Sequence, residues 1–113
     1  MRDYETVFIL DPGLDENQIK DEVGKVQDLI SDLKGEVVGV EPGGKRRLTY
    51  EIKGNREGYY TLITFRSEPS SIPEIERGYK LNEKVLRHII VRVDQKKIAG
   101  EEAQDQVEQK PEG

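Results

Sequence analysis

Apolar residues recur along the chain with two different periods, and these periods predict strands and helices. Segment 4–10 (Tyr-Glu-Thr-Val-Phe-Ile-Leu) is rich in β-branched and aromatic residues and predicts a strand. In segment 19–33 apolar residues are spaced by three and four, which predicts a helix with one buried face. Asp15 and Gln18 predict a capping pair at its start, and Gly35 fits the left-handed position just past its end.

Two further strands follow this helix. One begins at 36–41 and continues at 45–52, and Pro-Gly-Gly at 42–44 interrupts it. Because proline cannot donate to a sheet ladder, this interruption predicts a bulge or bend on an edge strand. Segment 59–66 is apolar on both faces in part, as 4–10 is, so both are expected to be central strands.

The last elements are a short helix and a strand over 85–93. Ser71 and Glu74 predict a capping box at the helix start. The expected inner face of the helix comprises Ile72, Ile75 and Tyr79. The order β-α-β-β-α-β with right-handed crossovers predicts a ferredoxin-like α+β sandwich: an antiparallel-type four-stranded sheet of order 4-1-3-2 with two helices on one face. The other face is left open.

Composition limits this prediction to one domain over residues 1–98, followed by a disordered acidic tail over 99–113. Of the chain's 23 acids and 18 bases, residues 101–113 hold five acids and one base, so residues 1–100 are close to neutral. The chain has no cysteine, which excludes a disulfide framework and a thiolate metal site. It also has no apolar run long enough to span a membrane, so we expect a cytoplasmic protein.

Signals for catalysis are few. His88 is the single histidine, so a cluster of histidines cannot hold a metal, and a packed or surface role is expected. The Gly43-Gly44-Lys45 run lacks the spacing of a phosphate-binding P-loop and precedes a strand rather than a helix. We therefore expect no enzyme, no cofactor and no metal.

A cluster of cations is the strongest functional signal. Lys45, Arg46 and Arg47 follow a double glycine at the root of a strand, where a folded sheet would hold their charge in place. Arginine suits a phosphate site because its planar fork can hold two phosphate oxygens. The other candidate cations on the strands are Arg2, Arg87 and Arg92. The alternative interpretation is scattered solubilising charge.

The open sheet face gives a second signal. An RNA-recognition motif would need alternating aromatic residues there for base stacking, but Thr61 stands two residues beyond Tyr59. The first strand instead offers Glu5, Val7 and Ile9 on this face. A mostly apolar face suits a protein partner better than stacked bases.

Three motifs resemble the bacterial small-subunit ribosomal protein S-six family. They are the run Gly44 to Ile52 (Gly-Lys-Arg-Arg-Leu-Thr-Tyr-Glu-Ile), the opening Met1-Arg2-x-Tyr4-Glu5, and Asn82 to Arg87 at the start of the last strand. The resemblance covers residues 1 to about 97. Thr49 stands where the family usually has Ala or Ser, and Asp3 where some members are basic.

The resemblance implies a ferredoxin-like protein, monomeric when free, that binds the central domain of small-subunit ribosomal RNA and pairs with the eighteenth small-subunit protein. The RNA-contact residues it implies, with Arg92 added as a strand cation, are Arg2, Lys45, Arg46, Arg47, Arg87 and Arg92. The expected protein-partner face comprises Glu5, Val7, Ile9, Tyr59 and Ile89. Two alternatives remain open: an acylphosphatase-like enzyme that uses Arg46 or Arg47 with Asn55, and a regulatory domain of the same topology that binds a small ligand.

Overall fold

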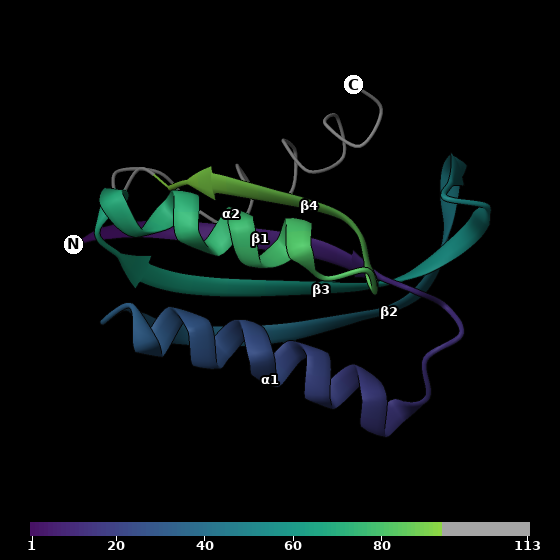
Figure 1. Cartoon of the computed structure of the whole chain (residues 1–113), viewed down its shortest axis with the longest axis horizontal. Coiled ribbons are helices and arrows are strands. Elements are labelled where there is room, and N and C mark those ends of the chain that lie inside the picture. The colour runs from purple at the N-terminus through teal and green to yellow at the C-terminus, as the bar shows by residue number, and fades with distance from the viewer. Residues whose placement is uncertain (94–113) are drawn as a thin grey trace.

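The computed structural model describes residues 1–93 of the 113-residue chain, and the predicted tail lies outside these described residues (Figure 1). The elements are β1 (Arg2–Leu10), α1 (Glu16–Asp32), β2 (Glu36–Ile52), β3 (Asn55–Ser67), a 3-10 turn (Pro69–Ser71), α2 (Ile72–Leu81) and β4 (Val85–Arg92). The predicted order of helices and strands is confirmed. Neither helix in residues 1–93 is long and apolar enough to cross a membrane.

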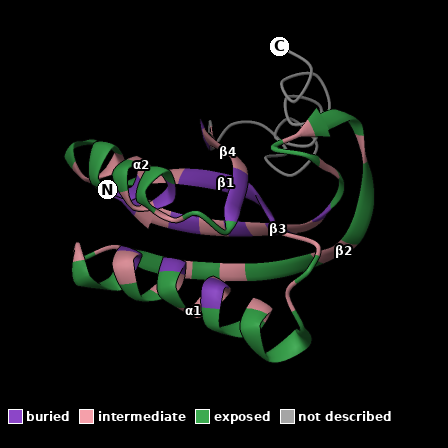
Figure 2. Ribbon diagram, turned by 45° about the vertical axis from the view of Figure 1, so that its right-hand side comes forward, coloured by how far each residue is buried: buried purple, intermediate pink, exposed green. Residues whose placement is uncertain are grey.

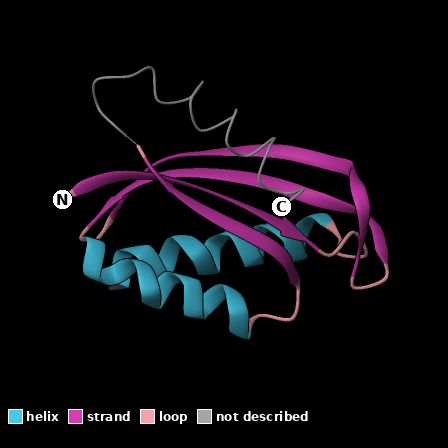
Figure 3. Cartoon of the chain, turned by 90° about the horizontal axis from the view of Figure 1, so that it is seen from above, coloured by secondary structure: helices cyan, strands magenta, loops and turns pink. Residues whose placement is uncertain are grey.

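The four strands form one antiparallel sheet of order β2-β3-β1-β4, which is the predicted 4-1-3-2 order counted from the other edge. β1 and β3 are the central strands, as their apolar composition predicted. Both helices lie against the same face of the sheet (Figure 3). The opposite face, which we call the open face, carries no helix from the described part of the chain. The ferredoxin-like α+β fold is therefore confirmed.

The core lies between the sheet and the helices, and buried residues concentrate on β1, on β3 and on the inner sides of the helices (Figure 2). The core side chains with no exposed surface are Phe8, Leu10, Ile30, Ile63 and Phe65. Because side chains alternate along a strand, one face of β1 supplies the core while the residues between them point to the open face.

The two ends of α1 differ in how well the sequence predicted them. The capping pair is confirmed: the Gln18 backbone N–H donates to Asp15 Oδ1 (2.8 Å), and the Asp15 backbone N–H donates to Gln18 Oε1 (2.9 Å). At the other end the prediction for Gly35 was wrong, because Lys34 takes the left-handed conformation with φ of 68°. Gly35 instead permits close packing, since a Cβ there would lie 2.9 Å from the Arg66 carbonyl oxygen.

The capping box predicted for α2 is also absent. The Ser71 side chain makes no capping hydrogen bond, because its backbone (φ −84°, ψ −17°) is already helical at the end of the preceding 3-10 turn. The predicted inner face is correct, with Ile75 and Tyr79 buried and Ile72 half-buried against the core.

β2 and β3 form a long hairpin that extends beyond the helices (Figure 1). β2 is one continuous edge strand with register shifts at Val37/Gly39, at Pro42/Gly44 and, near the hairpin turn, at Arg47/Ile52. The second shift is the bulge that the Pro-Gly-Gly run predicted. Gly44 adopts φ of 78°, a conformation that favours glycine. The strand therefore continues through the interruption and carries the basic residues out along the hairpin.

Candidate nucleic-acid and protein interface

The three consecutive cations of β2 do not share one surface, because successive side chains on a strand point to opposite faces. Lys45 pairs with Tyr59, and its Nζ lies 5.6 Å from the centroid of that ring on the helix side of the sheet. The Arg46 guanidinium lies 5.6 Å from the centroid of the Tyr60 ring on the side of the open face. Arg47 is exposed further along the hairpin, on the side of Lys45.

Arg87 joins Arg46 on the open face. Arg87 lies opposite Ile9 on β1, and its Nη1 donates to the Tyr50 hydroxyl (3.2 Å). Burial raises the pKa of Tyr60, whereas the positive charges of Arg46 and Arg87 oppose this shift. Both cations are therefore close to the same tyrosine. We call Lys45, Arg46, Arg47 and Arg87 the hairpin cation cluster.

The other two predicted RNA-contact residues lie at the opposite end of the sheet. Arg2 begins β1, and Arg92 pairs with Tyr4, whereas Arg87 pairs with Ile9 near the end of β1. At a rise of about 3.3 Å per residue, the five positions between Arg92 and Arg87 on β4 separate the nearest members of the two groups by roughly 17 Å. The six predicted cations thus form two groups rather than one patch.

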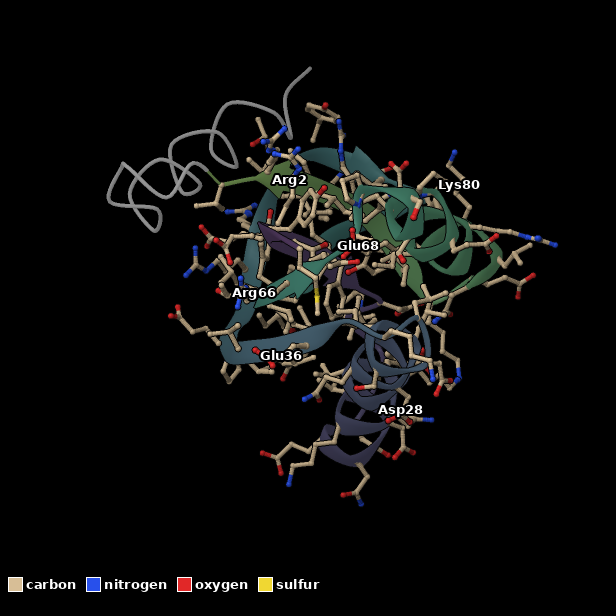
Figure 4. All side chains as sticks on the ribbon, turned by 90° about the vertical axis from the view of Figure 1, so that its left-hand side faces the viewer. Arg2, Asp28, Glu36, Arg66, Glu68 and Lys80 are labelled. Carbon is tan, nitrogen blue, oxygen red and sulfur yellow. The ribbon has the colours of Figure 1, made fainter. Side chains whose placement is uncertain are left out.

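At the end of the sheet near Arg2, acidic residues balance the basic ones more fully than they do at the hairpin cation cluster. Arg66 Nε lies 3.2 Å from Asp3 Oδ1, and the N-terminal ammonium lies 3.6 Å from a Glu68 carboxylate oxygen. Figure 4 shows Arg2, Glu36, Arg66 and Glu68 around this end of the sheet. Acids here accompany the cations, so the hairpin cation cluster is the stronger candidate for an anion.

Most predicted partner-face residues do lie on the open face. Val7 pairs with Leu62 on β3 and with Ile89 on β4, so these three apolar side chains are neighbours on that face. Glu5 and Ile9 flank Val7 on the same side of β1. Among the described residues this gives the open face an apolar centre.

The placement of Tyr59 on the open face was wrong. Tyr59 pairs with Leu10, a core residue, and packs against the core on the helix side. Its neighbour Tyr60 pairs with Ile9 and faces the open side instead. A shift of one position along a strand moves a side chain to the opposite face, so the open face carries Tyr60 rather than Tyr59.

The residues considered for catalysis have structural roles. The His88 ring stacks on Tyr79 (centroids 4.8 Å apart), and burial lowers the pKa of His88, which favours the neutral ring. The Asn55 side-chain amide donates to the Lys53 carbonyl oxygen (3.3 Å) within the hairpin turn. Residues 1–93 contain no cluster of three or more His, Cys, Asp or Glu side chains suited to a metal ion.

One buried charge was missed by the sequence analysis. Glu22 on α1 is 3% exposed and accepts hydrogen bonds from the side chains of Asn82 (2.6 Å) and Lys25 (3.0 Å), while Lys84 Nζ lies 3.9 Å away. Burial alone would raise the pKa of Glu22, but these bonds and the two lysine charges together lower it. Asn82 is 60 residues away in sequence, so no local pattern indicated this contact.

Comparisons with known proteins agree with the motifs. The sequence profile of the family described as Ribosomal protein S6 matches residues 3–92. Small ribosomal subunit protein bS6 of Clostridium kluyveri is 47% identical over 92 residues, covering 81% of this chain and 97% of that protein. The bS6 protein of Helicobacter acinonychis is 44% identical over 97 residues, covering 86% and 68%.

Solved structures give the same result. The crystal structure of 30S ribosomal protein S6 from Thermotoga maritima has a TM-score of 0.78 at 30% identity and covers 96% of this chain and 98% of that one. The C-terminal domain of MgtC from Mycobacterium tuberculosis has a TM-score of 0.54 at 12% identity over 87% and 94% of the two chains, and shares the fold alone.

Proposed function

Because the chain belongs to the ribosomal protein S6 family, we propose that it binds the central domain of small-subunit ribosomal RNA together with the eighteenth small-subunit protein. Membership of this family identifies the chain as a structural protein of the small ribosomal subunit in the cytoplasm and not an enzyme, as the sequence predicted. The observation that carries the proposal is the division of the sheet into a cationic hairpin end and an apolar open face.

The hairpin cation cluster supports the RNA contact. Three of its cations project from the two faces of an exposed hairpin and Arg87 joins them from β4, so they can meet phosphates on either side of a groove or strand. Phosphate contacts of this kind position a protein on RNA without reading its sequence, while RNA shape supplies the specificity. The rings of Tyr59 and Tyr60 lie against Lys45 and Arg46, which restrains these long side chains near the sheet.

The open face supports the protein contact. Its centre is formed by apolar side chains such as Val7, Leu62 and Ile89. Within residues 1–93, Leu62 stands two positions beyond Tyr60, so the described strands do not offer the aromatic pair on which an RNA-recognition motif stacks bases. Val7 is only 6% exposed, whereas Leu62 and Ile89 are half-buried, so a protein partner would meet the centre of this face mainly through Leu62 and Ile89.

The salt dependence of RNA binding tests the RNA contact. An Arg46→Ala/Arg47→Ala variant is titrated with a central-domain RNA fragment in the presence of the eighteenth protein, over a range of salt concentrations. Two lost phosphate contacts should flatten the slope of log K against log salt by about 1.4–1.8. The matched control is Arg2→Ala/Arg92→Ala, which removes the same charge from the opposite end of the sheet and should change the slope less. An unchanged slope in the hairpin variant would remove the hairpin cation cluster from the interface.

A further inference from the structure

Glu5 is a buried acidic residue on the open face of the sheet. It lies on the central strand β1 between Thr64 of β3 and Val91 of β4, and only 4% of its surface is exposed. Its Oε1 atom is buried and has no hydrogen-bond partner among the described residues. A buried carboxylate oxygen without a hydrogen-bond partner is costly, so the stability of the free domain does not explain this position.

The charges around Glu5 do not compensate it. Arg66 is the cation nearest in register on the same face. Its Nε lies 3.2 Å from Asp3 Oδ1 as an ion pair, but within residues 1–93 this nitrogen is itself buried without a hydrogen bond and makes none to Glu5. Glu41, on β2, adds a second negative charge: burial raises the pKa of Glu5, and the charge of Glu41 raises it further. On β4 the neighbours of Glu5 and Val7 are the apolar residues Val91 and Ile89. This part of the open face is therefore apolar with an excess of negative charge.

A partner that covers the face must satisfy this carboxylate. Covering Glu5 with apolar groups alone would remove its last contact with water and leave the charge unpaired, which is strongly unfavourable for a buried ion. RNA is a poor occupant, because its phosphates would meet the charges of Glu5 and Glu41. A cationic side chain surrounded by apolar ones fits both the charge and the apolar surroundings.

We propose that the protein partner docks on the open face with an apolar segment that carries a lysine or arginine, and that this cation pairs with Glu5. The inference rests on the proposed function in that it takes the eighteenth small-subunit protein as the partner. The inference goes beyond the proposed function because it assigns Glu5 as the residue that selects a cationic side chain of the partner. Val7 and Ile89 would contact the apolar residues next to that cation. Glu5 is then retained for recognition although it costs the free domain stability.

Two measurements on one variant test this assignment. Glu5→Gln keeps the size of the side chain and removes its charge, and its affinity for the purified eighteenth protein is measured by titration calorimetry. Loss of a charge-assisted, buried bond should weaken binding about 10- to 100-fold. The melting temperature of the free variant should equal or exceed that of the unchanged chain, because the variant no longer buries an unpaired charge. The matched control Glu41→Gln removes an exposed charge on the same face and should weaken binding less than about threefold.

The outcomes separate this inference from the proposed function. If Glu5→Gln binds as tightly as the unchanged chain, the Glu5 inference is wrong while the proposed pairing stands. If Glu5→Gln loses affinity and melting temperature together, Glu5 is structural and the inference is again wrong. If the unchanged chain does not bind the eighteenth protein at all, the pairing in the proposed function fails, and the Glu5 inference fails with it. Weaker binding with an undiminished melting temperature supports the inference.

Discussion

Replacement of Asn82 by aspartate should destabilise the domain at neutral pH, and acid should restore part of the loss. The Asn82 amide is the closest hydrogen-bond donor to buried Glu22, at 2.6 Å, and it joins the end of α2 to α1. Asn82→Asp keeps the oxygen that accepts the Lys84 backbone N–H (3.0 Å) but replaces the donor with a second carboxylate. The variant therefore changes one contact while it keeps the shape of the side chain.

The magnitude follows from two terms. A hydrogen bond to a charged group contributes about 1.5–3 kcal/mol, and repulsion between the adjacent carboxylates adds to its loss. We expect a fall of about 2–4 kcal/mol in the free energy of unfolding at pH 7.5. For a domain of this size, each kcal/mol lowers the melting temperature by about 4–8 °C.

The pH dependence distinguishes this mechanism from general damage. In the unchanged chain the pKa of Glu22 is lowered, so its stabilising effect is complete above its ordinary value of 4.5 and is lost as pH falls through the folded pKa. In Asn82→Asp two carboxylates share one site, which raises one pKa. The folded variant then binds more protons than its unfolded chain, and it gains stability as pH falls through that raised pKa.

Urea denaturation of the full chain at pH 7.5 and pH 5 measures the difference. The gap between unchanged chain and Asn82→Asp should narrow by about 1–2 kcal/mol at pH 5, since a pKa shift is worth about 1.4 kcal/mol per unit. Asn82→Ala, the control, loses the bond without adding charge, and its gap should change less. A gap for Asn82→Asp that is equal at both pH values would refute the assignment of the Glu22–Asn82 contact.

Two smaller perturbations test the local structure. Asp15→Ala removes the side chain that caps α1 and should lower the free energy of unfolding in urea by about 1 kcal/mol; no loss would mean that the capping pair is not stabilising. Gly58→Ala places a methyl group against Ile9 Cγ2 and 3.3 Å from the Leu10 carbonyl oxygen, so it should cost about 1–3 kcal/mol, measured in the same way. A neutral result there would show that β1 and β3 can separate without penalty.

The fold was predictable because its signals are local and mutually consistent. The apolar spacing in segment 19–33 predicted α1, and the Asp15–Gln18 pair predicted the residue at which this helix begins to within one position. The doubly apolar strands 4–10 and 59–66 are central, as their composition required. The predictions that failed concern helix ends. At Gly35, close packing against the Arg66 carbonyl determines the residue, and sequence spacing alone does not reveal that contact.

The site was predictable in residue types but less so in geometry. Tyr59 and Tyr60 are adjacent, and only the pairing of Leu10 with Tyr59 decides which of them faces the core. Alternation alone could have separated Lys45 from Arg46, because consecutive strand residues face opposite sides. Contacts between residues far apart in sequence could not be predicted in this way. Whether Glu5 Oε1 finds a hydrogen-bond partner depends on residues of β2 and β3, and no local sequence pattern shows this.

The same strand, β1, relates the two proposed interfaces to each other. Glu5 and Ile9 lie on one face of it, four residues or roughly 13 Å apart at about 3.3 Å per residue, and Ile9 neighbours Arg87 and Tyr60. The open face is therefore negative near Glu5 and positive near the hairpin cation cluster. A partner segment with its cation at Glu5 leaves the cationic end free for phosphates, whereas the reverse orientation would place that cation beside the hairpin cation cluster and leave Glu5 unpaired. If both proposals hold, charge would fix the direction in which the partner lies on the sheet, and the RNA and protein contacts would occupy adjacent but separate parts of the surface.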